Sequence, residues 1–216
     1  MAILDSADDD DLLIAGHLSM TLLSGTVCVF SHCCRVVLLE KDVEGSIEYV
    51  SARDNPERLF EYNPYGETPT LVDRELILYD PAVIIEYLDE RFPHPPLMPV
   101  DPISRAKTRL IISRLVRDWL EPLSDFEEKG GKPPAELKKN IRDGLLALSP
   151  LFAQQPYFMS EEYTLADAYF TPLLWRLPWL GIALPKQANA VRAYAERMFT
   201  RPAFTGSLSR QEAGLR

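Results

Sequence analysis

The chain has 216 residues, of which 46% are hydrophobic, and a formal net charge of −9 at pH 7. The length predicts one large domain or two small ones, and the apolar fraction permits a sizeable core. An acidic chain without a long basic face is poorly suited to gripping phosphates, so we expect no direct binding to nucleic acid. No apolar run reaches the length of about eighteen residues that a membrane span needs, so we expect no membrane association.

The start of the chain lacks the pattern of a secretory signal. No basic segment precedes an apolar segment there, and residues 8–11 are all aspartate. We expect a disordered, solvated extension over residues 1–19, with the folded part beginning at Met20. The three cysteines, Cys28, Cys33 and Cys34, are odd in number and close together, which does not form a disulfide framework and is typical of a reducing cytoplasm.

Strand and helix patterns alternate through the first half of the chain. Short apolar or alternating runs predict strands at residues 20–23, 47–51, 70–72 and 76–78. Helices are predicted at residues 31–42, in a turn opened by Asn55 and Pro56, and at residues 81–90. Asp80 is a favourable N-cap and Pro81 a favourable first residue for the last of these. The order strand, helix, strand, helix, strand, strand, helix is that of a thioredoxin-like α/β domain over residues 20–92.

A change of pattern follows. Residues 93–99 contain four prolines, which exclude a helix or a central strand, so residues 93–101 are predicted to be a linker. Residues 102–216 then read as an all-helical domain. The predicted helices are residues 102–127, with a kink at Pro122, followed by 135–152, 164–177 and 188–200. Thr164 and Asp167 form a capping-box-like start for the third of them.

Several stretches carry a family resemblance. Residues 67–73 (ETPTLVD), 76–81 (LILYDP) and 84–88 (IIEYL) resemble the glutathione-binding half of a glutathione transferase. Residues 86–99 (EYLDERFPHPPLMP) and 172–178 (PLLWRLP), with 63–66 (NPYG) and 71–74 (LVDR), resemble the bacterial stringent starvation protein A family. This resemblance covers about nine-tenths of the chain.

The resemblance implies both a fold and a role. The expected fold is a thioredoxin-like N-terminal domain followed by an all-helical, transferase-type C-terminal domain. Members of the family are homodimers that associate with RNA polymerase and regulate transcription under starvation and acid stress, without ordinary glutathione-transferase activity. The matching surface motif here is Pro93, His94 and Pro95, which the resemblance implies is a partner contact. No cofactor is expected.

The proline-flanked His94 admits two interpretations from the residues themselves. Restricted φ angles and missing backbone donors favour a stiff, polyproline-like loop. Such a loop loses little conformational entropy on docking, so it could be a preorganised contact for a protein partner. It could equally be a rigid interdomain linker, and only the resemblance favours the contact.

The resemblance also places a vestigial glutathione pocket at Cys28, Thr68, Pro69, Asp80 and Pro81. Pro69 is expected to follow a cis peptide bond, as in thioredoxin-like folds. The position of Pro81 is normally a serine that donates its N–H and hydroxyl to a carboxylate of glutathione, and proline has neither donor. Losing a charge-assisted hydrogen bond of roughly 1.5–3 kcal/mol weakens binding about tenfold to a hundredfold.

Cys28 supports an alternative function. A thiol just before a helix is favoured as thiolate, so the protein could be a monothiol glutathione-dependent transferase or reductase using Cys28. Val29 replaces the proline usual in such motifs and Ser31 replaces a second thiol, so no dithiol cycle is available. The spacing of His32 with the three cysteines does not match a zinc template, and we expect no metal. The primary prediction is a non-enzymatic, cytoplasmic regulator that binds RNA polymerase, with or without a sigma factor.

Overall fold

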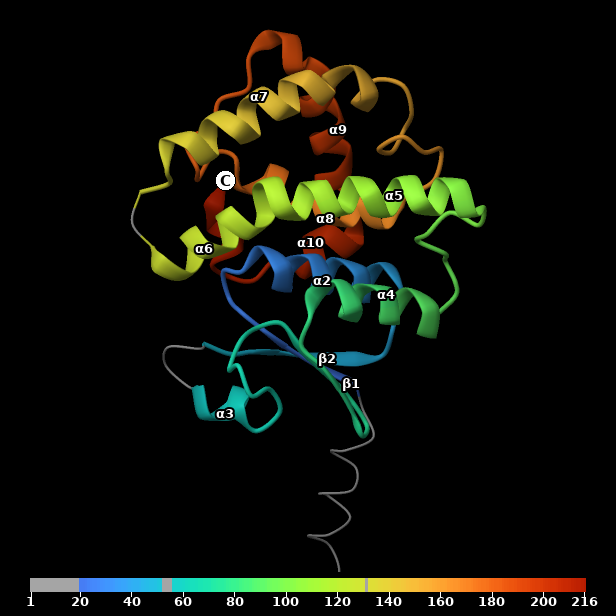
Figure 1. The fold of residues 1–216 in the computed structure, drawn as a ribbon, viewed down its shortest axis with the longest axis vertical. Helices are drawn as coiled ribbons and strands as arrows, with labels where there is room; N and C mark the ends of the chain where they lie inside the picture. Colours follow the sequence, from blue (N-terminus) through green and yellow to red (C-terminus); the bar gives the residue numbers. More distant parts are fainter. Residues whose placement is uncertain (1–19, 52–55, 131) are drawn as a thin grey trace, which may run out of the picture.

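The computed structural model describes residues 20–51, 56–130 and 132–216. The extension predicted at residues 1–19 and the helix-opening Asn55 lie outside these residues. The first half contains β1 (Met20–Ser24), α2 (Val29–Glu40), β2 (Gly45–Tyr49), α3 (Pro56–Phe60), β3 (Thr70–Asp73), β4 (Leu76–Leu78) and α4 (Pro81–Arg91) (Figure 1). This is the predicted order of elements, and the thioredoxin-like arrangement is confirmed.

The four strands form one mixed sheet in the order β2-β1-β3-β4. β1 runs parallel to β2, with Leu22 opposite Ile47, and antiparallel to β3, with Leu22 opposite Leu71. β3 and β4 form the predicted hairpin, whose turn contains Arg74 at a φ of 57°. Leu22 and Leu71 are fully buried, because α2 and α4 lie between this sheet and the helical half of the molecule (Figure 1).

Helix α2 begins and ends two residues earlier than the sequence predicts. Cys28, in extended conformation, is its N-cap, and its sulfur accepts a hydrogen bond from the backbone N–H of Ser31 at 3.4 Å. Most of α2 is buried, since it packs on the sheet and α4 and also contacts α8 and α10 of the helical half. Cys33 and Cys34 are both fully buried in this packing.

The second half is helical, as predicted. It contains α5 (Pro102–Leu115), a π-helical turn η1 (Val116–Leu120), α6 (Glu121–Lys129), α7 (Ala135–Phe152), α8 (Leu165–Arg176), η2 (Lys186–Ala188), α9 (Asn189–Phe199), α10 (Pro202–Ser207) and η3 (Glu212–Leu215). The helical half stacks on α2 and α4, so the sheet, this helix pair and the bundle form successive layers (Figure 1). No helix in the described ranges is long and apolar enough to cross a membrane.

The long helix predicted over residues 102–127 is interrupted one turn before Pro122. The proline has no N–H for the carbonyl of Asp118 and its ring crowds that carbonyl, so the helix widens into a π turn at residues 116–120. The capping box at Thr164 is confirmed, because an Asp167 oxygen accepts the Thr164 N–H at 2.8 Å. The short helices α10 and η3 were not predicted.

Candidate functional site

The predicted pocket residues Cys28 and Thr68 do meet in the structure. The Thr68–Pro69 bond is cis, as predicted, and Pro69 is buried. The thiol of Cys28 points at the Thr68 carbonyl, with 3.8 Å between sulfur and oxygen. A Cβ at Gly25 would lie 2.8 Å from both Cys28 Cβ and Thr68 Oγ1. The two loops therefore touch closely at this point, and the Thr68 carbonyl already has a donor.

The N-terminus of α4, where an anion would bind, is filled by the chain itself. Asp80 Oδ1 accepts hydrogen bonds from Ala82 N at 2.9 Å and Val83 N at 3.0 Å. Pro81 offers no N–H, and the Ile84 N–H bonds the Asp80 carbonyl at 2.9 Å. The positive end of the helix thus already holds a carboxylate, which would repel a second one.

A carboxylate also occupies the N-terminus of α2. Glu127 of α6 accepts the Val29 N–H at 2.7 Å from a position 98 residues away. Burial, followed by the charge of Glu127, raises the pKa of the Cys28 thiol. The expectation that the helix end favours a Cys28 thiolate is therefore wrong, because burial and the charge of Glu127 outweigh the groups that stabilise the thiolate. No sequence signal singled out Glu127.

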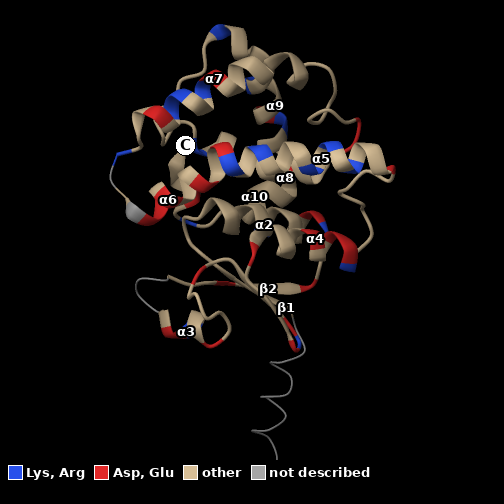
Figure 2. Cartoon of the chain, viewed as in Figure 1, with Lys and Arg blue, Asp and Glu red and all other residues tan. Residues whose placement is uncertain are grey.

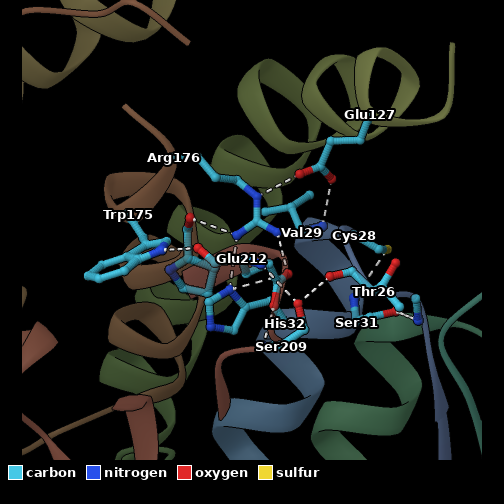
Figure 3. A network of polar contacts seen from close by, with 12 residues as sticks. Thr26, Cys28, Val29, Ser31, His32, Glu127, Trp175, Arg176, Ser209 and Glu212 are labelled. Carbon is cyan, nitrogen blue, oxygen red and sulfur yellow. Dashed lines mark hydrogen bonds and ion pairs between the residues drawn. The ribbon is translucent and has the colours of Figure 1, made fainter. Parts of the chain in front are cut away.

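Glu127 belongs to a buried network of charges shown in Figure 3. The other carboxylate oxygen of Glu127 accepts from Arg176 Nε at 2.6 Å. Arg176 Nη2 donates to Glu212 Oε1, also at 2.6 Å. The side chains of Arg176 and Glu212 are completely buried, and that of Glu127 is 2% exposed. The network joins α6 and α8 to the C-terminal segment.

Arg35 extends the network to the first strand. Its guanidinium pairs with the second oxygen of Glu212 and donates to the Ser24 hydroxyl. It also donates to the Ser207 carbonyl at 2.7 Å and the Gly25 carbonyl at 3.1 Å. These contacts fix the loop between β1 and α2 to the end of the chain. Arg35 and Glu212, which pair directly, are 177 residues apart in the sequence.

His32 sits inside this network as a neutral side chain. Its Nδ1 accepts from Arg176 Nη1 at 2.9 Å, so its Nε2 carries the proton and donates to the Ser207 hydroxyl at 2.9 Å. Burial, then the charges of Arg176 and Arg35, hold the pKa of His32 well below its usual value. With both nitrogens engaged, His32 has no free lone pair for a metal.

The predicted contact residues Pro93, His94 and Pro95 are all exposed. The loop is fixed by Lys41, a buried residue at the end of α2. Lys41 Nζ lies 2.5 Å from Asp89 Oδ1 and donates to the Pro95 carbonyl. The same Asp89 oxygen accepts the Leu97 N–H at 2.8 Å, so both sides of the motif are tied to one carboxylate.

The conformation of the motif differs from the prediction in one respect. The His94–Pro95 bond is cis, whereas a polyproline helix has trans bonds throughout, so the loop is not polyproline-like at this point. Pro93 and His94 line a surface cavity of about 730 Å³ whose other walls include Asp42, Arg74 and Arg91. The motif thus borders a hollow on the edge of the sheet domain.

Acidification is expected to destabilise the protein through His32. The pKa of this group in the unfolded chain is about 6.5 and its native pKa is lower, so its contribution to stability is complete above about pH 6.5. Below that pH the unfolded chain takes up a proton that the native protein does not, and the free energy of unfolding falls by up to about 1.4 kcal/mol per pH unit.

His32→Gln removes this titration while keeping a neutral hydrogen-bonding side chain. We expect the difference in unfolding free energy between wild type and His32→Gln, measured by urea denaturation from about pH 7 to about pH 5, to shrink or reverse as the pH falls. A constant difference across this range would show that His32 is not responsible.

Two family models match the chain. The model described as "Glutathione S-transferase, N-terminal domain" matches residues 27–91, and the model "Glutathione S-transferase, C-terminal domain" matches residues 102–202. A glutathione S-transferase from Rhodospirillum rubrum superposes with a TM-score of 0.77 at 22% identity, covering 91% of this chain and 99% of the other. At that identity the similarity establishes the fold alone.

Two curated relatives are closer in sequence. The stringent starvation protein A homolog of Pasteurella multocida is 46% identical over 190 residues, which cover 88% of this chain and 90% of the relative. That of Coxiella burnetii is 43% identical over 198 residues, covering 91% of this chain and 95% of the relative. The chain therefore belongs to the stringent starvation protein A family, built on the two-domain glutathione-transferase fold.

Proposed function

We propose that the protein is a non-enzymatic regulator of transcription that binds RNA polymerase through a surface containing Pro93, His94 and Pro95. Family membership supports the role, and one observation carries the assignment of the surface. An exposed histidine stands in a loop whose conformation is fixed by a buried ion pair, between Lys41 and Asp89. Binding in response to starvation or acid stress is the condition that the family resemblance implies.

The held loop reduces the entropic cost of docking. Ordering an exposed loop on binding costs free energy for every side chain and backbone segment that is immobilised. Here the Pro95 carbonyl and the Leu97 N–H are already bonded to Lys41 and Asp89, and three of the four residues 93–96 are prolines. His94 is therefore offered to a partner with little further ordering.

The charge of the chain agrees with a protein partner rather than with DNA. A net charge of −9 favours association with basic faces, which a polymerase or its sigma factor can present, and opposes contact with phosphates. The proposal therefore places the regulator on the enzyme, and not on the promoter.

Substitution of His94 tests the surface directly. We expect His94→Ala to weaken recovery of purified core or holo RNA polymerase about tenfold in a pull-down, because a central contact residue is worth roughly 1–2 kcal/mol or more. Lys139→Ala, an exposed change on α7, is the control and should bind as wild type. Equal recovery by wild type and His94→Ala would overturn the surface, and no recovery by wild type would overturn the proposed partner.

We also propose that the protein forms a symmetric homodimer. Large apolar side chains are exposed on β4 and the start of α4, at Leu76, Ile77, Tyr79 and Val83. Beside them, a groove of about 480 Å³ separates α4 from α5 and is lined in part by Ile112. An isologous contact would bury these apolar groups on both copies at once.

The dimer is tested by its mass. Sedimentation equilibrium at micromolar concentration should give twice the 24.5 kDa of one chain. Val83→Asp should shift the protein to monomer, because it places two like charges in a buried symmetric contact, whereas Lys139→Asp should leave the dimer intact. A wild-type mass of one chain would refute the dimer.

The second candidate is a monothiol glutathione-dependent transferase or reductase using Cys28. It is favoured by the position of the thiol as the N-cap of α2, where Ser31 N–H bonds its sulfur at 3.4 Å. It is opposed by the raised pKa of Cys28 and by the carboxylates of Glu127 and Asp80 at the two helix ends. We therefore rank the enzyme below the regulator.

Restoring the missing donor separates the two. By calorimetry we expect wild type to show no glutathione binding below millimolar concentration, and Pro81→Ser to gain about tenfold to a hundredfold, because serine returns an N–H and a hydroxyl. Micromolar affinity in wild type, or thiol-transfer activity that Cys28→Ser abolishes, would favour the enzyme instead.

A further inference from the structure

A cavity of about 290 Å³ lies in the helical half between α5 and α7, apart from the pocket residues and from the Pro93–His94–Pro95 loop. Its walls are mainly apolar and include Leu115, Trp119, Leu148, Leu151, Phe158 and Phe170. The aromatic walls are packed on one another, with ring centroids 4.5 Å apart for Phe158 and Phe170 and 6.4 Å apart for Trp119 and Phe170. These packed rings therefore form a rigid apolar wall of the cavity.

A second cavity, of about 250 Å³, adjoins the first and is polar. The two share Ile111, Phe158 and Met159 as a common wall. The second is lined by polar side chains from α5 and from the segment before α8, namely Ser104, Lys107, Thr108, Ser160 and Thr164. An apolar chamber and a polar chamber thus stand side by side along α5.

The wall of the apolar chamber depends on a close approach of two helices. A Cβ at Gly144 of α7 would lie 2.2 Å from Cζ2 of Trp119, so only glycine lets the indole lie against α7. Trp119 comes from the π turn, a feature that often occurs at functional sites. The indole is held in place, and the space beside it stays open.

Met159 stands between the chambers. It is 46% exposed and lies in a tight turn, at a φ of 54°, between Tyr157 and Ser160, which form a small bridge. The backbone N–H of the neighbouring Phe158 donates a hydrogen bond to Asp167 Oδ1 at 2.8 Å. The backbone of the turn is thus anchored, while the flexible thioether can adapt to a ligand passing from one chamber to the other.

Basic residues lie along α5 beside the two chambers. α5 carries four basic residues, Arg105, Lys107, Arg109 and Arg114, and no acidic one, in a chain that is acidic overall (Figure 2). Arg109 pairs with Glu86, but Lys107 makes no ion pair with any residue that the structure describes. Lys107 is exposed, and among the residues lining the polar chamber no carboxylate is present, so Lys107 is the charged residue of that lining. Arg114 and Asp118, of opposite charge, both border the apolar chamber.

We propose that these two chambers form a binding site for an amphiphile with a single anionic head, of the class of medium-chain fatty acids. The apolar chain lies against Trp119 and Phe170, and the carboxylate lies beside Lys107 and the neighbouring hydroxyls. Apolar walls with a few convergent polar groups are typical of small-molecule sites. This site is independent of the proposed contact with RNA polymerase.

Decanoate is the probe, measured by calorimetry and by NMR of protein labelled at the methionine methyl groups. We expect a dissociation constant of about 10–100 μM and a shift of the Met159 methyl signal, assigned with Met159→Leu. Lys107→Gln should weaken binding about fivefold to tenfold, and decanol should bind wild type more weakly by a similar factor. Ala147→Phe, which projects an aromatic ring into the apolar chamber from an exposed position, should weaken binding at least tenfold.

Lys139→Gln, an exposed cation of α7 outside both cavities, is the control and should bind decanoate as wild type. If Ala147→Phe fails to fold, Ala147→Leu fills the same space with less bulk. The proposal is overturned by a flat wild-type titration up to about 1 mM, by an unmoved Met159 signal, or by unchanged affinity in the Ala147 variant. Equal affinity for decanol and decanoate would overturn the anionic head.

Discussion

The fold depends on one buried set of charges, in which Glu212 lies between Arg35 and Arg176 while Glu127 completes the pairing of Arg176. Two guanidinium groups and two carboxylates balance, and the neutral His32 adds no charge. Each ion costs several kcal/mol to remove from water, and removing one partner of such a set destabilises a protein by about 3–5 kcal/mol, because it leaves a buried charge unpaired. The folded protein is therefore stable only when all four charged side chains of the network are present.

The same network also affects the predicted pocket around Cys28. Arg176 holds Glu127, and Glu127 caps the N-terminus of α2. Asp80 does the equivalent at the N-terminus of α4. In both places a side chain of the protein takes the position where a helix end would attract an anionic ligand or stabilise a thiolate. Pro81, which has no N–H to donate, acts in the same direction as Glu127 and Asp80.

The features that the sequence predicted correctly are those that depend on local patterns. The seven elements of the sheet domain, the bounds of α7 and the caps at Asp80 and Thr164 follow from periodicity and from residues that act on their own neighbours. The family resemblance added the cis bond before Pro69. Contacts between distant residues were out of reach, since nothing in the sequence pairs Glu127 with Val29 or Arg35 with Glu212.

Short elements were missed for a related reason. α10 has six residues and η3 has four, which is too few for a helical period to be visible in the sequence. Their stability comes from tertiary contacts instead, because Ser207 and Glu212 bond to Arg35 across the molecule. The π turn before Pro122 differs from these elements, because its cause is the proline itself, from which the sequence predicted a kink but not the widened turn.

Helix α2 connects the predicted pocket at Cys28 with the loop of His94. Its N-terminus carries Cys28 and the capping Glu127, and its C-terminus carries Lys41, whose charge suits the negative end of the helix dipole. Lys41 then fixes the loop of His94 through Asp89 and the Pro95 carbonyl. Because α2 is packed on both sides, it does not shift independently of the core. One end of α2 thus carries a thiol beside a capping carboxylate, and the other end supports the fixed loop of His94. This contrast is the physical basis for proposing recognition of a partner rather than chemistry.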